Sequence, residues 1–219
     1  MDYNSKLYKT IDYIQGIFSA INWMPLYALF NKGKGYNLTE EDHSLLKEKL
    51  ANSYYIILTY RKTHLTTYLL GILALIKTGK WPTYGHALMN VDSITSAGDW
   101  EKYKFEEAEH AGVVFSKFLD VFNCDRVCLL KPKSLNNDQW NNVIDGMLTQ
   151  FGEPYDDLFD LSESQHVSCV ELVLDALKKD SNYQIDFANL QSQIDKIGNL
   201  TPQMYRDCPD FEIVLEIKR

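Results

Sequence analysis

The chain has 219 residues, 45% of them hydrophobic, so it can bury a substantial core and is not expected to be disordered. Its 30 acidic side chains outnumber its 22 basic ones, and the net charge of −8 argues against nucleic acid as the main partner, since phosphate contacts need clustered Lys and Arg. The 4 cysteines show no disulfide-like spacing, which favours a reducing compartment. No signal-peptide pattern is found at the N-terminus, so a cytoplasmic or virion-associated protein is expected.

Residues 1–51 are expected to form a helical N-terminal extension to a domain over residues 52–219. Apolar residues recur at helical spacing over residues 11–21, and Thr39 with the acidic residues after it predicts a helix to about Ala51. Two apolar stretches stand out: polar residues interrupt the one over residues 11–30, and the one over residues 65–76 is too short to span a bilayer. Both are interpreted as buried helices. Docking of residues 1–50 on a membrane surface or on another protein is left open.

Strand and helix patterns alternate through the rest of the chain. Strands are predicted over residues 54–59, 86–91, 103–108, 112–115, 125–130 and 211–217. Helices are predicted over residues 66–77, 116–122 and 135–151, and from residue 169 to about residue 179. This order predicts an α+β fold in which a mostly antiparallel sheet packs against helices.

Cys169 is the candidate nucleophile. It stands where an amphipathic segment begins, so its thiol would face the unpaired N–H groups and the positive end of a helix. Both favour the thiolate, which is the nucleophilic form. The alternative interpretation is a buried structural cysteine, because cysteine is among the most buried residue types.

A thiolate mechanism also needs a base, and His86 is the best placed of the 5 histidines. It begins an apolar strand directly after a turn, and a base on a sheet facing a cysteine at a helix tip is the geometry of papain-like enzymes. His43 lies in an acidic helix and is expected to be exposed. His166, three residues before Cys169, is poorly placed to act from an opposite wall.

A third group should orient the imidazole, and the next strand offers Glu106 and Glu107. Successive strand residues point to opposite faces, so only one of the two can face the histidine. The alternation by itself leaves the choice open.

A metal site is the competing interpretation of the cysteines. Cys124 and Cys128 are four residues apart, and His166 and Cys169 are three apart. Cys128, however, alternates with apolar residues inside a predicted strand. No metal and no cofactor are therefore expected.

The order of motifs resembles a known family. From residue 54 the chain reads an apolar strand, a helix, TYGHALMNV, then EEA and AGVV, DRVCLLKP, a helix, FGEPYDDLFDLSESQHVSCVELV and a late LTPQMYRDCPDF. This resembles the YiiX-like branch of the circularly permuted NlpC-type papain-fold hydrolases, in which the histidine strand precedes the cysteine helix. The resemblance covers about residues 52–215.

The resemblance implies a permuted papain-like fold and roles for individual residues. Cys169 would be the nucleophile, His86 the base and Glu107 the orienting acid. Tyr155 and Asp156 match the family's Tyr-Asp and would support the site beside the cysteine helix, although Tyr155 could simply pack in the core. The chain departs from the family pattern in two places, with a glycine before the histidine and a valine after the cysteine.

The expected activity is a cysteine-dependent hydrolase or acyl transferase that works through an acyl-enzyme. Its substrate would be a peptide, peptidoglycan or a lipid, cleaved at an amide or ester bond. The alternative is a non-catalytic structural or interaction protein, for example a phage virion component, that keeps the permuted papain-like fold.

Overall fold

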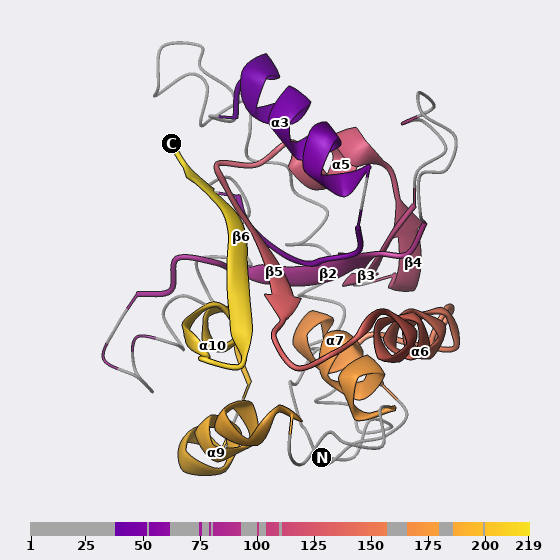
Figure 1. The fold of residues 1–219 in the computed structure, drawn as a ribbon, viewed down its shortest axis with the longest axis vertical. Coiled ribbons are helices and arrows are strands. Elements are labelled where there is room, and N and C mark those ends of the chain that lie inside the picture. Colours follow the sequence, from indigo (N-terminus) through magenta and orange to yellow (C-terminus); the bar gives the residue numbers. More distant parts are fainter. Residues whose placement is uncertain are drawn as a thin grey trace, which may run out of the picture.

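The computed structural model describes residues 38–51, 53–61, 75, 79, 81–92, 100, 104–109, 111–156, 166–179, 186–198 and 200–219. The predictions for residues 1–37, and for the helix over residues 66–77 apart from residue 75, lie outside these ranges. In the described ranges a central sheet lies between two layers of helices (Figure 1).

The sheet has six strands in the order β4-β3-β2-β1-β5-β6, and every neighbouring pair runs antiparallel. The strands are β1 Ile56–Tyr60, β2 His86–Asn90, β3 Phe105–Glu109, β4 Gly112–Ser116, β5 Arg126–Pro132 and β6 Phe211–Lys218. Each predicted strand is confirmed, with ends that differ by one or two residues at most. The prediction of an α+β fold with an antiparallel sheet is therefore confirmed.

Helices cover both faces of the sheet. They are α3 Glu40–Leu50, α5 Phe118–Phe122, α6 Asn137–Leu148, α7 Cys169–Lys178, α9 Ala188–Ile197 and α10 Pro202–Asp207. In Figure 1, α3 and α5 lie on one face, α6 and α7 on the other, and α9 and α10 beside the start of β6. Neither α9 nor α10 is predicted from the sequence pattern.

Strand alternation divides the buried apolar side chains into two cores. In β1, Ile56 and Leu58 face a core shared with α6 and α7, whereas Ile57 faces a core shared with α3 and α5. A strand that is buried on both faces reads as a continuous apolar run, which explains why the segment from residue 54 onward does not alternate.

Helix α3 packs on the sheet through Leu46, which lies in the core shared with α5. Arg219 at the chain end binds the Asp42 carboxylate at 2.7 and 3.0 Å. The expectation that His43 is exposed is wrong: its residue is 8% exposed, and its Nε2 lies 3.2 Å from the carbonyl oxygen of Phe122 in α5. The burial of His43 comes from packing between segments that are far apart in sequence.

The division of the chain at residue 51 into an N-terminal extension and a domain stays a prediction.

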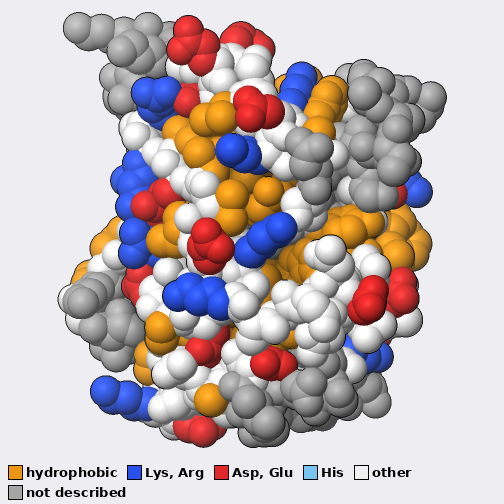
Figure 2. Space-filling view, in the orientation of Figure 1, with side chains coloured by type: hydrophobic (Ala, Val, Ile, Leu, Met, Phe, Trp, Pro, Cys, Tyr) orange, Lys and Arg blue, Asp and Glu red, His pale blue; other side chains and the backbone are white. Residues whose placement is uncertain are grey.

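The helices of the described ranges include none that is long and apolar enough to cross a membrane. On the face seen in Figure 2, acidic and basic side chains are interspersed between apolar patches. The exclusion of nucleic acid and the docking of residues 1–50 remain predictions.

Candidate active site

Cys169 is the first residue of α7, and a capping box fixes the start of this helix. The Ser168 hydroxyl accepts the N–H of Glu171 at 3.4 Å, and the Glu171 carboxylate accepts the N–H of Ser168 at 2.9 Å. The thiol, 3% exposed as a residue, is thereby placed at the positive end of the helix. Sequence reasoning missed the cap, although a serine followed three residues later by a glutamate is its signal.

His86 is the first residue of β2, and it connects Glu107 with Cys169. Its Nε2 donates to Glu107 Oε2 at 2.7 Å, where the histidine side chain is 23% exposed and the glutamate side chain 1%. Cys169 lies close enough to act on the pKa of His86, through its charge and as a hydrogen-bonding partner. Because Nε2 is occupied by the carboxylate, Nδ1 is the nitrogen left for the sulfur.

The charges of these groups reinforce one another. Burial opposes protonation of His86, but the Cys169 thiolate, the hydrogen bond to its sulfur and the Glu107 carboxylate outweigh burial and raise the pKa of His86 to about 10. Burial likewise opposes ionisation of Glu107, yet its bond to His86 lowers the pKa of this carboxyl below its usual value. The arrangement therefore favours a protonated His86 ring bound to the ionised Glu107 carboxylate at neutral pH.

The structure distinguishes the two glutamates of β3. Glu107 meets His86, while Glu106 projects from the opposite face of the strand and pairs across the sheet with Met89 and Phe115. Glu106 is fully buried, and neither carboxyl oxygen has a hydrogen-bond partner among the described residues. Burial raises the pKa of Glu106 to about 8, so this side chain is a neutral acid at pH 7.

Replacing Glu106 by glutamine should make the protein more stable at about pH 8 and change little at about pH 4. The pKa of Glu106 rises from 4.5 to about 8 on folding, so the unfolded chain releases a proton that the folded chain retains between these values. Wild-type stability therefore falls as pH rises through this window, and the glutamine removes that loss, worth about 2 kcal/mol or more at pH 8. Urea unfolding of wild type and Glu106→Gln at both pH values measures the difference in their free energies of unfolding.

The exposed Glu212 on β6 supplies the matched control, because Glu212→Gln should leave the pH dependence of unfolding as it is. A Glu106→Gln protein whose stability relative to wild type is the same at both pH values would contradict the assignment of Glu106 as a buried neutral acid.

Tyr155 and Asp156 lie beside the segment that leads into Cys169. Tyr155 forms a parallel bridge with Val167, and the N–H of Asp156 donates to the Val167 carbonyl at 3.3 Å. Asp156 is fully buried, and Tyr155 packs against the core shared by α6 and α7. Both residues therefore lie at the segment that enters α7, and their supporting role in the site stays a prediction.

The other cysteines lie apart from this arrangement. Cys124, Cys128 and Cys208 are free, buried thiols, and burial raises the pKa of each to about 12. Over the described part of the chain, no three or more His, Cys, Asp or Glu side chains are grouped so that they could hold a metal ion.

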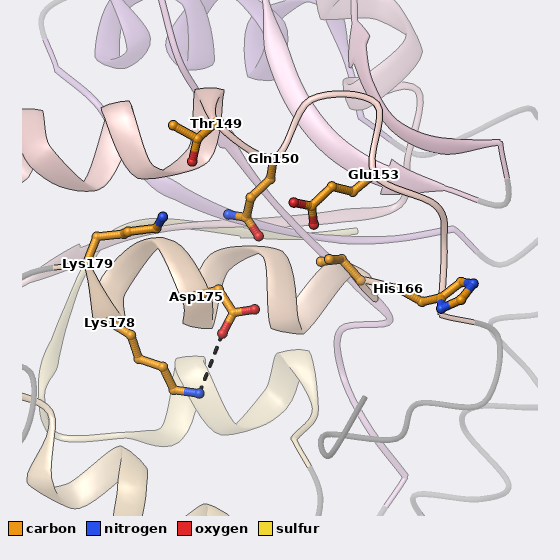
Figure 3. Close-up of a pocket in the computed structure, with 8 residues that line it drawn as sticks. Thr149, Gln150, Glu153, His166, Asp175, Lys178 and Lys179 are labelled. Carbon is orange, nitrogen blue, oxygen red and sulfur yellow. Dashed lines mark hydrogen bonds and ion pairs between the residues drawn. The ribbon is translucent and has the colours of Figure 1, made fainter. Parts of the chain in front are cut away.

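A groove of about 490 Å³ runs along the outer side of α7 and the end of α6 (Figure 3). His166 lies at one end and Lys178 and Lys179 at the other, with Asp175 paired to Lys178 at 3.5 Å between them. A second pocket of about 410 Å³ is lined by Glu107 together with Arg61, residues of β3 and β4, and Asp120 of α5. The groove in Figure 3 is not lined by Cys169 or His86, so it lies outside the candidate catalytic group.

Comparison with known proteins gives one informative result. No family model matches the chain, and no curated protein matches it. The crystal structure of the metalloprotein YiiX from Escherichia coli O157:H7 is similar, with a TM-score of 0.55 and 15% sequence identity over 78% of this chain and 99% of that chain. The protein therefore has a YiiX-like α+β fold, and at this identity the similarity concerns the fold alone.

Proposed function

We propose that this protein is a cysteine-dependent hydrolase or acyl transferase in which Cys169 is the nucleophile. The observation that carries the proposal is the bond from Glu107 to His86, together with the action of Cys169, at the tip of α7, on the pKa of that ring. A nucleophile, a base within hydrogen-bond reach and a third group that orients the base are the parts that covalent catalysis requires.

The mechanism follows from these contacts. The Cys169 thiolate attacks the carbonyl carbon of the substrate, and the backbone N–H of Cys169 stabilises the resulting oxyanion at the N-terminus of the helix. His86 gives its proton to the departing amine or alcohol, which leaves a thioester on Cys169. His86 then removes a proton from water, the hydroxide releases the acid, and the thiolate and imidazolium form again. Glu107 keeps its charge throughout and fixes the orientation of the ring.

We also propose that the fold is a permuted papain-like one. The base comes from β2, the orienting acid from β3 and the nucleophile from a later helix, α7. This chain order is the reverse of that in papain itself. It agrees with the motif order from which the NlpC-type resemblance was inferred.

The description of YiiX as a metalloprotein does not transfer readily to this chain. No group of ligating side chains suited to a metal is found within the described ranges, and His86 and Glu107 are already bound to each other. The proposed chemistry is therefore built on the thiol of Cys169.

The substrate is proposed to carry an amide or ester bond in a peptide, peptidoglycan or a lipid. A site-mapping experiment tests the class of reaction before the natural substrate is known. Wild-type protein is mixed with p-nitrophenyl butyrate, quenched in acid during turnover, digested and analysed by mass spectrometry.

A butyryl group on the peptide that contains Cys169 is the expected result. The peptides with Cys124, Cys128 and Cys208 serve as internal controls and should carry none, because burial raises the pKa of these thiols to about 12. Butyryl groups spread over all four cysteines, or none on Cys169, would count against the proposal and would favour a non-catalytic role.

A further inference from the structure

Helix α10 is bonded to the segments that carry the proposed nucleophile and the proposed base. The hydroxyl of Tyr205 donates to the carbonyl oxygen of Val170 at 2.8 Å, and Val170 is the residue after Cys169. The side-chain oxygen of Gln203, two residues earlier on α10, accepts the N–H of Thr83 at 2.9 Å, three residues before His86. One short helix thus joins the first turn of α7 to the turn that leads into β2.

A second set of hydrogen bonds links α10 to the turn that precedes β2. Arg206 of α10 binds Glu216 on β6 through Nε at 3.0 Å and through a terminal nitrogen at 3.2 Å. The hydroxyl of Tyr84, two residues before His86, donates to the same carboxylate at 2.7 Å, and Tyr84 is fully buried. Burial opposes ionisation of Glu216, but Arg206, Tyr84 and Lys218 outweigh it and lower the pKa of Glu216 to about 2. The carboxylate therefore stays charged and bonded across the working pH range.

These contacts have a geometric consequence. Cys169 and His86 lie on elements that are 83 positions apart in the chain, and each is the first residue of its element. The first residue of a helix or strand is held less firmly than an interior one, so the relative position of thiol and ring depends on what restrains the two preceding segments. Tyr205 is fully buried, and its ring packs edge-on against Phe211 at 5.7 Å between ring centroids, so its hydroxyl has little freedom to move.

We propose that α10 sets the separation between the Cys169 sulfur and the His86 ring, with Tyr205 and Gln203 as positioning residues. The inference rests on the proposed function, and it adds that thiolate formation at Cys169 depends on bonds made by a helix that contributes no catalytic group. A displacement of about 1 Å between reacting groups is enough to cost a large rate factor.

The test compares Tyr205→Phe with Tyr55→Phe. Both variants remove one hydroxyl from a buried tyrosine, but Tyr55 lies in the core on the other face of the sheet. The rate of Cys169 alkylation by iodoacetamide is measured from about pH 5 to pH 9, together with the kcat and KM for p-nitrophenyl butyrate. Tyr205→Phe should move the rise in alkylation to higher pH and lower kcat about tenfold with KM unchanged. Tyr55→Phe should match wild type in both.

Gln203→Ala keeps the proposal testable if Tyr205→Phe does not fold, because Gln203 is only partly buried and its bond to Thr83 lies outside the core. It should change the alkylation profile in the same direction. Wild-type profiles in both α10 variants would overturn the positioning role. Failure of the proposed function would look different: wild-type protein would form no acyl adduct, whereas the alkylation profiles of wild type and variants would still differ.

Discussion

Replacing Cys169 by alanine is expected to abolish hydrolysis of p-nitrophenyl butyrate above the uncatalysed rate and to remove the acyl adduct. The thiolate is the attacking group, and Cys169 is the cysteine that acts on the pKa of His86. Alanine retains the helix start, because the cap is made by Ser168 and Glu171 and not by the thiol. Loss of activity should therefore occur without loss of fold, which circular dichroism and the initial rate of p-nitrophenol release measure together.

Cys208→Ala is the matched control for this variant. Cys208 is 2% exposed, close to the 3% of Cys169, but its sulfur lies 3.3 Å from an oxygen of Asp210 and burial raises its pKa to about 12. This control should hydrolyse the ester at the wild-type rate. A Cys169→Ala protein that still turns over the ester at a rate comparable to the control would rule out the thiol mechanism.

Replacing His86 by alanine is expected to lower kcat/KM by about 10³-fold, the middle of the range for general acid–base catalysis. The variant loses both the proton donor for the leaving group and the positive charge that stabilises the Cys169 thiolate. Alkylation of Cys169 at about pH 6 should slow as well, because the remaining helix N-terminus alone supports the thiolate less strongly. Steady-state kinetics and iodoacetamide labelling of the same preparations provide the two readouts.

His166→Ala is the comparison variant for His86→Ala, since His166 is only three residues from Cys169 in the chain but lines the groove on the outer side of α7. It should retain most of the wild-type activity. If His166→Ala lost as much activity as His86→Ala, the assignment of the base to β2 would be wrong.

The start of α7 could be predicted from the sequence because local chemistry determines it. The amphipathic pattern after Cys169 predicts a buried helix, and α7 begins at that residue. The strands could be predicted for a similar reason, since β1 and β5 are apolar runs bounded by polar or turn-forming residues.

The partner of His86 could not be chosen from the alternation of β3 alone. Glu106 and Glu107 are adjacent and identical, and which one meets the histidine depends on the register with β2, where Met89 pairs with Glu106. Register is a long-range property. The motif resemblance named Glu107, and the structure places that carboxylate against the ring.

Helix α10 and the burial of His43 also depend on distant contacts. Only Met204 and Tyr205 of α10 are buried, which is too short a pattern to predict a helix, and the hydroxyl of Tyr205 finds its acceptor 35 residues away. His43 finds its partner in α5, 79 residues along the chain. Neither contact leaves a periodic signal near the residue concerned.

The most direct test of the proposed catalytic unit is an NMR titration of the His86 ring in wild type, Cys169→Ala and Glu107→Gln, with Glu106→Gln as control. The wild-type ring should titrate with a pKa of about 10. This pKa should fall by about one unit or more in the first two variants, because each removes a negative partner of the imidazolium, and should not fall in Glu106→Gln. A ring that titrates near its ordinary value of 6.5 in wild type, and is unaffected by either substitution, would contradict the proposed catalytic unit.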